Sequence, residues 1–267
     1  YADRLPLRRV FEGRQGLSRA RNAGLEAAAG ELIIFTDDDV RFDPAWLRTY
    51  WEAYQAHPSG YFFGGPVESL FEGTPPPPAL MRFAPYSVRG LDLGEAEGPV
   101  PRTARFISAN WACEKAALLK VGGFNPDLGL GSREGKVSIG EETELMDRLH
   151  AIGMERFYLP RARLRHFVPM SKCSVQHIGD RQQANVERRM LQEPGEWMEK
   201  WEKGWFCSLR LRLSFRYEYL WRRFRGRPGY AQYIHMRQIE GEYRAYRELK
   251  RRAQSSAANV AQRRNCA

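Results

Sequence analysis

Glu31-Leu-Ile-Ile-Phe-Thr-Asp-Asp-Asp-Val40 is the stretch that decides the fold, because four apolar residues stop abruptly at three consecutive aspartates. An apolar run such as Leu32 to Phe35 suits a strand of a parallel sheet that is covered on both faces. Open α/β sheets bind ligands outside the carboxyl ends of such strands, where Asp37, Asp38 and Asp39 would lie. The stretch therefore predicts an α/β fold with an acidic site at a strand end.

Three adjacent carboxylates at a partly buried strand end favour a bound cation. Two unit charges about 4 Å apart interact by about 1 kcal/mol in bulk water, but by about 4 kcal/mol at an effective dielectric constant of about 20. Oxygen ligands favour Mg²⁺ or Mn²⁺, and Mg²⁺ is usually held by one or two carboxylates together with substrate phosphates. The pattern indicates a metal and diphosphate site. The alternative is a solvated acidic turn that precedes Asp43-Pro44.

The composition is that of one large domain with an appendage. The chain has 267 residues, of which 43% are hydrophobic, so it can bury a full core. We expect a soluble or peripheral protein, because the sequence shows no apolar run of about 18 residues and no secretory h-region at its beginning. Its cysteines have no CxxC spacing, which indicates a reducing compartment and no structural zinc; they are Cys113, Cys173, Cys207 and Cys266.

Charge is distributed unevenly along the chain. Residues 1–195 contain 25 Lys and Arg against 25 Asp and Glu, whereas residues 196–267 contain 17 against 7. The last 72 residues therefore carry the whole net charge of +10.

Several further elements can be expected from local patterns. We expect a strand at residues 7–12 and then a helix capped by Ser18 that leads into the aspartate strand. Residues 72–103 show no sustained period and predict a long loop over the site. A strand is expected at residues 104–110, followed by a helix and the turn Gly122-Gly-Phe124.

A second acidic feature opens the stretch Gly140-Glu-Glu-Thr-Glu-Leu-Met-Asp-Arg-Leu-His-Ala-Ile-Gly153, which reads as a helix that begins at or just before Glu141. Leu145, Met146, Leu149 and Ile152 are expected to form its inward stripe, and Glu142 lies on the same stripe. The alternative is that Glu141 and Glu142 only stabilise the start of the helix through its dipole.

Residues 162–168, Ala-Arg-Leu-Arg-His-Phe-Val, alternate as a strand does. Arg163 and Arg165 share one face, and Leu164 and His166 share the other. A lone histidine on a packed face is more often a core residue than a ligand, and both readings of His166 stay open.

Four features follow one another along the chain. They are the helix from Gly16 to Gly24, the Asp37-Asp-Asp39 turn, the Asn110 strand with its Gly122-Gly-Phe124 turn, and Gly140-Glu-Glu142 ahead of His166. In this combination, residues 7–170 resemble the family 2 glycosyltransferases of the GT-A fold. The resemblance implies a Rossmann-like, mostly parallel sheet flanked by helices.

The resemblance also implies roles for the residues. Asp39 and His166 would bind Mn²⁺ or Mg²⁺, Asp37, Asp38 and Arg21 would contact the donor, and Glu142 would be the catalytic base. Asn110, Trp111 and Glu141 would lie on the acceptor side. The implied reaction is inverting transfer of a sugar from a nucleotide diphosphate sugar to an acceptor hydroxyl, including that of a lipid-linked or cell-surface polysaccharide precursor.

Two departures from the family pattern stand out. The family has Asp where this chain has Glu142, so the carboxylate reaches one methylene farther. The family also begins with a strand, a helix and a strand whose acidic loop holds the nucleotide base, and no such unit precedes Tyr1. We therefore expect either a fragment of a longer protein or an incomplete donor site.

We expect two domains, a catalytic domain at residues 1–170 and a basic, aromatic-rich and mainly helical region at residues 171–267. Trp197, Trp201 and Trp205 recur every four residues, and further aromatics and arginines follow, among them Trp221 and Phe224. Arginines beside aromatics suit an anionic membrane surface, and they also suit nucleic acid. The alternative is that the aromatics pack this region on the catalytic domain.

Two functions follow from these features. The first is a metal-dependent glycosyltransferase that is cytoplasmic and peripheral at the cytoplasmic face of the membrane. The second is a catalytically inactive scaffold of the same fold that binds a membrane surface or nucleic acid. The acidic strand end argues against nucleic acid as the ligand at that site.

Overall fold

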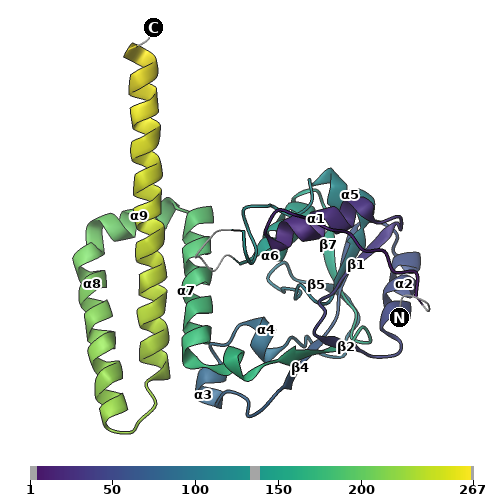
Figure 1. Ribbon diagram of the computed structural model, residues 1–267, viewed down its shortest axis with the longest axis horizontal. Coiled ribbons are helices and arrows are strands. Elements are labelled where there is room, and N and C mark those ends of the chain that lie inside the picture. The colour runs from purple at the N-terminus through teal and green to yellow at the C-terminus, as the bar shows by residue number, and fades with distance from the viewer. Residues whose placement is uncertain (1–4, 133–138, 266–267) are drawn as a thin grey trace. The chain divides into compact units, whose positions relative to one another are not determined.

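A computed structural model of the chain describes residues 5–132 and 139–265, and within helices it leaves the side chains at positions 196, 200, 205–209 and 256–265 undescribed. The chain divides into two compact units. The first consists of residues 1–74 and 86–169, and the second of residues 75–85 and 170–267. Figure 1 shows the strands in the first unit and long helices in the second. The domain boundaries expected from sequence remain a prediction.

The first unit contains eight described strands and five described helices. The strands are β1 (Leu32–Phe35), β2 (Val40–Phe42), β3 (Tyr61–Gly64), β4 (Val67–Phe71), β5 (Gly98–Val100), β6 (Trp111–Glu114), β7 (Glu155–Tyr158) and β8 (Leu164–Val168). The helices are α1 (Leu17–Ala27), α2 (Trp46–Ala56), α4 (Tyr86–Arg89), α5 (Lys115–Lys120) and α6 (Glu141–Ala151).

These strands form two sheets. The larger has the order β1-β6-β3-β7-β5, and the smaller has the order β2-β8-β4. The chain leaves the first sheet at Phe35 and enters the second at Val40, so the three aspartates occupy the passage from one sheet to the other. This passage positions the acidic site.

The α/β class and the helical C-terminal region are confirmed, but the large sheet is not mostly parallel. Among its described pairs only β3 with β7 is parallel, whereas β1 with β6, β3 with β6, and β5 with β7 are antiparallel. The apolar run of β1 gave no information on strand direction, because burial depends on what covers a strand and not on which way its neighbour runs. Only Phe35 of β1 is buried, and the other three residues are partly exposed.

Three expected elements differ in the structure. Residues 7–12 form no strand, and the strand expected at residues 104–110 begins only at Trp111. Residues 72–103 contain α3 (Pro78–Met81), α4 and β5, so this segment is not a structureless loop. Short elements of three or four residues give too few periods to be recognised from sequence.

An aromatic cluster forms the core beside the acidic passage. The ring of Phe35, the last residue of β1, stacks on Trp111 at 4.7 Å between centroids and meets Phe124 edge-on at 5.1 Å. Trp111 has no exposed surface. The side chain of Trp111 is thus enclosed by the core, and its expected acceptor contact stays a prediction.

Asn110 is also fully buried, and it joins four parts of the fold. Its Oδ1 accepts hydrogen bonds from Trp46 Nε1 at 2.7 Å and from the Tyr50 hydroxyl at 2.9 Å. Its Nδ2 donates to the carbonyls of Pro66 at 2.9 Å and Ala162 at 2.8 Å. All four hydrogen bonds of its amide are thus made inside the protein, and the acceptor contact expected for Asn110 stays a prediction.

The second unit is helical. Its elements are α3, a 3₁₀ turn at Met170–Cys173, α7 (Val175–Gln192), α8 (Gly195–Phe224) and α9 (Tyr230–Asn265). Trp201 of α8 is buried, stacks on Tyr246 of α9 at 5.7 Å and donates from Nε1 to Glu242 at 3.1 Å. Within the ranges that the structure covers, no helix combines the length and apolar character that crossing a bilayer requires.

Substituting the buried amide tests the role of Asn110. Asn110→Ala should lower the free energy of unfolding by about 3 kcal/mol or more, because each buried group left without a partner costs about 1–3 kcal/mol. Urea unfolding measures the loss. Asn125→Ala is the matched control, since Asn125 accepts a single exposed hydrogen bond from the Asp127 amide, and this variant should lose about 1 kcal/mol or less. Equal losses in the two variants would contradict the buried role of Asn110.

Candidate metal and donor site

The pairing of β2 with β8 brings the aspartates to His166. The two strands are antiparallel, and Val40 lies opposite His166. The Phe167 amide donates to the Asp39 carbonyl at 2.8 Å, which fixes Asp39 beside the end of β8. His166 Nε2 lies 3.3 Å from Asp39 Oδ1. The alternation of residues 164–168 places His166 on the buried face, as predicted.

Asp37, Asp39 and His166 can hold a metal ion together. Each offers one ligand atom, and these atoms lie within 4.8 Å of one another. The imidazole is buried, whereas the two carboxylates are each about one-third exposed, so the group can be approached from solvent. Two carboxylate oxygens with one imidazole nitrogen suit Mn²⁺, whereas Mg²⁺ prefers an all-oxygen shell. The residues present fit the cation that the sequence indicated.

Arg21 connects this cluster to the second acidic feature. Its Nη2 lies 3.3 Å from Asp37 Oδ1, and its Nη1 lies 3.1 Å from Glu141 Oε1. The guanidinium also lies over the ring of Phe124, with Cζ 5.4 Å from the ring centroid. The Arg21 side chain is only 10% exposed. It therefore holds the end of β1 and the start of α6 at a fixed separation.

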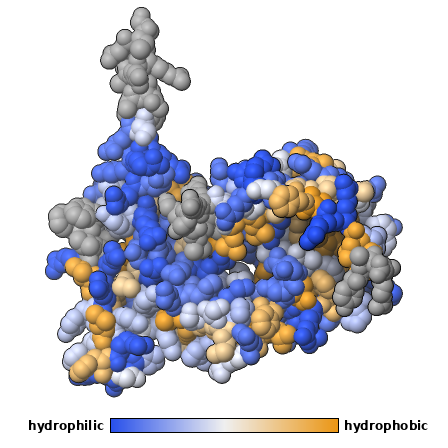
Figure 2. Space-filling model, viewed as in Figure 1, coloured by the Kyte–Doolittle hydropathy of each residue, from blue (hydrophilic) through white to orange (hydrophobic). Residues whose placement is uncertain are grey.

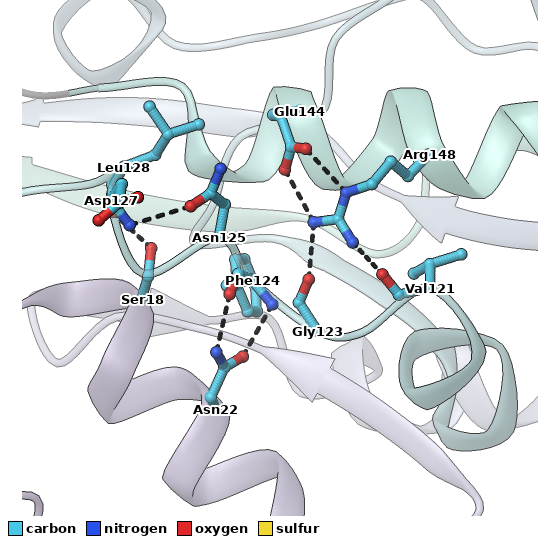
Figure 3. A network of polar contacts seen from close by, with 10 residues as sticks. All are labelled: Ser18, Asn22, Val121, Gly123, Phe124, Asn125, Asp127, Leu128, Glu144 and Arg148. Carbon is cyan, nitrogen blue, oxygen red and sulfur yellow. Dashed lines mark hydrogen bonds and ion pairs between the residues drawn. The ribbon is translucent and has the colours of Figure 1, made fainter. Parts of the chain in front are cut away.

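The turn after α5 positions both helices that carry these groups (Figure 3). Asn22 of α1 exchanges two hydrogen bonds of 2.8 Å with the backbone of Phe124, and Ser18 Oγ donates to the Leu128 carbonyl at 2.6 Å. Gly123 has φ +68, and a Cβ there would come 2.7 Å from Asn22 Oδ1. Ser18 was expected to cap α1, but α1 begins at Leu17 and Ser18 instead reaches across to this turn.

Helix α6 is held against the same turn by an arginine. Arg148 pairs with Glu144 one helical turn earlier at 2.8 Å through Nε and Nη2. Its Nη1 donates to the Val121 carbonyl, and its Nη2 also donates to the Gly123 carbonyl (Figure 3). This contact fixes α6 along its axis. The glutamates at its first turn are thereby fixed in position.

The two glutamates at the start of α6 have different surroundings. Helix α6 begins at Glu141, after Gly140 in the left-handed conformation with φ +89. Leu145, Met146 and Leu149 are buried as predicted, but Ile152 is 40% exposed because α6 ends at Ala151. Glu141 is buried and its carboxylate is paired with Arg21. Its predicted acceptor contact is not supported, because the carboxylate faces Arg21.

Glu142 is partly exposed, but its Oε2 atom is buried and has no hydrogen-bond partner among the residues described. Removal of this carboxylate from water and the neighbouring Glu141 carboxylate together raise its pKa to about 7, while Arg21 opposes the shift. A carboxyl group with a pKa near neutrality can both accept and release a proton at physiological pH. This property distinguishes Glu142 from Glu141.

The structure thus brings together most of the residues singled out from sequence. Asp37, Asp39, His166, Arg21 and Glu141 form one connected set, with Glu142 adjacent to it in the chain. Asp38 is exposed and is not a member of the metal cluster.

Sequence reasoning missed the residues that position the site. Arg148 could have been recognised from its spacing of four residues after Glu144, which is typical of a helical ion pair. Asn22 gave no comparable signal, because its partner Phe124 is 102 positions away in the chain.

Residues 3–108 match the sequence model of the family described as glycosyl transferase family 2. This range includes Arg21 and the three aspartates, but it ends before Glu142 and His166.

Curated relatives carry related names. The chain is 30% identical over 155 residues to the pre-mycofactocin glycosyltransferase of Mycobacterium tuberculosis, covering 57% of this chain and 30% of that protein. It is 27% identical over 156 residues to the glucosyl-dolichyl phosphate glucuronosyltransferase of Haloferax volcanii, covering 57% and 48%. It is 29% identical over 181 residues to the validoxylamine A glucosyltransferase of Streptomyces hygroscopicus, covering 58% and 40%. The chain spans less than half the length of each of these three relatives.

Two solved structures show more distant similarity, each with a TM-score of 0.41 over 67% of this chain. They are GalNAc-T7 with UDP, GalNAc and Mn²⁺, at 14% identity and 38% coverage of that chain, and the Pyrobaculum calidifontis mannosyltransferase PcManGT with GDP-Man and Mn²⁺, at 17% identity and 44% coverage.

The family match contains the aspartate turn and the helix that supplies Arg21, and the curated relatives align over more than half of this chain. On this basis residues 3–108 are similar to glycosyl transferase family 2, and the curated relatives that align with this chain are glycosyltransferases.

Proposed function

We propose that this chain carries out metal-dependent, inverting transfer of a sugar from a nucleotide diphosphate sugar to an acceptor hydroxyl. The observation that carries the proposal is the convergence of Asp37, Asp39 and His166 within 4.8 Å at the passage between the two sheets. The names of the curated relatives agree with a glycosyltransferase, and both solved structures described above contain a nucleotide and Mn²⁺.

In this proposal Glu142 acts as the general base. It accepts the proton of the acceptor hydroxyl while the acceptor oxygen forms its bond to the anomeric carbon and the bond from that carbon to the diphosphate breaks. One base is sufficient for this displacement, and the direct attack inverts the anomeric configuration. The raised pKa of Glu142 matches the role, because the efficiency of a general base is greatest when its pKa lies near the working pH.

The other residues hold and orient the reacting groups. Asp39, His166 and Asp37 would hold Mn²⁺, which when bound supplies Lewis acidity to the departing diphosphate. Arg21 forms ion pairs with both Asp37 and Glu141 and so holds Glu141 in place. Glu142 follows Glu141 directly, so this ion pair also limits the movement of the base.

The alternative of an inactive scaffold has less support. An inactive member of the family has no need of a cluster of potential metal ligands or of a carboxyl group with a pKa near 7, and the first unit has both features. The donor sugar and the nature of the acceptor, lipid-linked or not, are decided by contacts that these residues do not specify.

The metal assignment can be tested by binding alone. Asp39→Asn should weaken Mn²⁺ binding by about tenfold or more, since it replaces a charged ligand by a neutral amide of the same shape. Calorimetric titration of Mn²⁺ into the protein measures the change. Asp38→Asn is the matched control and should retain wild-type affinity, because Asp38 is exposed and lies outside the cluster. If the two variants lose affinity equally, the assigned ligand set is wrong.

The base assignment can be tested by turnover. Glu142→Gln preserves size and hydrogen bonding but cannot accept the proton, so turnover should fall by about 10² to 10⁴. Release of nucleoside diphosphate from a panel of nucleotide sugars with Mn²⁺ measures the rate, and Mn²⁺ affinity should not change. Glu155→Gln, at an exposed glutamate of β7, should retain full turnover. Full activity of Glu142→Gln would exclude Glu142 as the base.

Because the pKa of Glu142 is raised, replacing its carboxyl group by a neutral amide should stabilise the folded protein by an amount that depends on pH. Between the ordinary value of 4.5 and about 7, the folded protein binds a proton that the unfolded chain releases, so stability falls as the pH rises through this window. Above it the full cost of the buried charge is present. Glu142→Gln should therefore stabilise the protein by on the order of 2 kcal/mol near pH 8 and by almost nothing near pH 4.5.

Urea unfolding of wild type and Glu142→Gln at the two pH values measures this difference. Glu155→Gln serves again as the control and should show no such pH dependence. A stability gain of equal size at both pH values would contradict the raised pKa, because an uncharged carboxyl differs little from an amide.

A further inference from the structure

Helix α8 has apolar side chains on two opposite faces. One face packs on α9: Phe215 lies 5.4 Å from His235 and Tyr219 lies 5.3 Å from Tyr233, measured between ring centroids. Arg212 adds an ion pair of 3.3 Å to Glu240 on the same side. A helix with one packed face would normally be polar on the other.

The second face is exposed. Leu213, Tyr217, Leu220 and Phe224 are 57%, 70%, 56% and 87% exposed, and their spacing of four, three and four residues places them in one stripe. Trp221 extends the stripe and stacks against Phe224. Figure 2 shows the corresponding apolar colour along the lower half of α8. This set of five residues is called the α8 stripe below.

Arginines border the α8 stripe on both sides. At about 100° per residue, Arg216 and Arg223 lie along one edge and Arg210 along the other, and all three are exposed. Arg225 lies over the ring of Trp221 at 4.2 Å where α8 turns back toward α9. From position 210 to position 229 the sequence contains seven arginines and a single acidic residue, Glu218.

We propose that the α8 stripe is a docking surface for an anionic lipid bilayer. Leucine, phenylalanine and tryptophan would enter the boundary between headgroups and acyl chains, and the bordering arginines would meet lipid phosphates and anionic headgroups. Tyr217 and Trp221 have the amphipathic rings that concentrate at the depth of the headgroups.

Two other occupants fit these residues less well. Nucleic acid stacks on aromatic rings, but Leu213 and Leu220 offer no ring to a base. In a symmetric contact between two copies, each copy presents the same patch, so the bordering arginines of both would be brought together. An anionic bilayer satisfies the apolar stripe and the cationic border at once.

The experiment uses the full chain with vesicles of phosphatidylcholine and phosphatidylserine, and with vesicles of phosphatidylcholine alone. Co-sedimentation measures binding. The wild type should bind the anionic vesicles at low salt, bind the neutral ones at least about tenfold more weakly, and be released only in part by high salt, because apolar insertion is not screened. Absence of binding to anionic vesicles at low salt would overturn the proposal.

Variants of matched exposure distinguish the stripe from the rest of α8. Leu213→Ser combined with Phe224→Ser should weaken binding by about tenfold or more. The control is Leu211→Ser combined with Phe11→Ser: Leu211 is 52% exposed on α8, about 200° around the helix from Leu213, and Phe11 is 91% exposed in the first unit. The control should bind like the wild type. Equal losses in the two double variants would overturn the proposal.

The cationic border needs its own test. Arg216→Gln with Arg223→Gln should weaken binding to anionic vesicles by roughly fivefold for each residue and leave binding to neutral vesicles unchanged. Arg9→Gln with Arg48→Gln removes the same charge from exposed positions of the first unit and should have a much smaller effect. If both pairs lower binding equally, net charge and not the α8 stripe attracts the protein.

Two further readouts separate a bilayer from other partners. Binding should shift the tryptophan fluorescence to shorter wavelength, and Trp221→Phe should remove most of the shift because Trp221 is the tryptophan in the stripe.

Light scattering should show one oligomeric state for the wild type and the Leu213→Ser, Phe224→Ser variant. A change in that state without vesicle binding would mean that the stripe is a contact between copies, and preferential binding to single-stranded nucleic acid would mean that it serves that ligand; either result would overturn the proposal.

Discussion

The ion pairs of Arg21 determine the arrangement of the site. One guanidinium lies within 3.3 Å of Asp37 and 3.1 Å of Glu141, although these carboxylates belong to segments more than 100 positions apart in the chain. Glu141 has almost no contact with water, and removing the partner of a buried charge costs about 3–5 kcal/mol. The same charges act on Glu142, because Glu141 raises its pKa and Arg21 lowers it. The Arg21 side chain therefore links Asp37 of the candidate metal cluster to the start of α6, which carries the proposed base.

Local sequence rules located the functional groups but not the contacts between them. An apolar run ending in aspartates, a helix start at Glu141 and an alternating strand at residues 164–168 each depend on neighbours in the chain, and each is present in the structure. The register that sets Val40 opposite His166 depends on antiparallel pairing of segments about 120 positions apart. No local pattern encodes that pairing, so the role of His166 rested on resemblance to a family.

What sequence reasoning could not decide has a common physical cause. Asn110 and Trp111 follow a stretch that was expected to be a strand near the acceptor, and their side chains could equally serve a ligand or the core. A buried amide needs two donor and two acceptor partners inside the protein, and Asn110 has four such bonds. Sequence shows the capacity for these bonds but not whether the partner is protein or substrate. Strand direction was misjudged for a similar reason. The apolar composition of a strand indicates that the strand is buried, but it does not indicate whether the neighbouring strand runs parallel or antiparallel to it.

The charges of the site also constrain the order in which ligands bind. A nucleotide diphosphate sugar is an anion, and it would approach Asp37 and Asp39, of which only Asp37 is paired with Arg21. Each pair of like charges at about 4 Å costs about 4 kcal/mol at an effective dielectric constant of about 20. Residues 1–74 and 86–169, which make up the first unit, contain 20 Lys and Arg against 22 Asp and Glu, so this unit offers no general attraction that offsets the repulsion. We therefore infer that the carboxylates exclude the diphosphate unless a divalent cation is bound first or enters with it. The cluster would then act as a filter for the metal-bound donor as well as a holder of the metal.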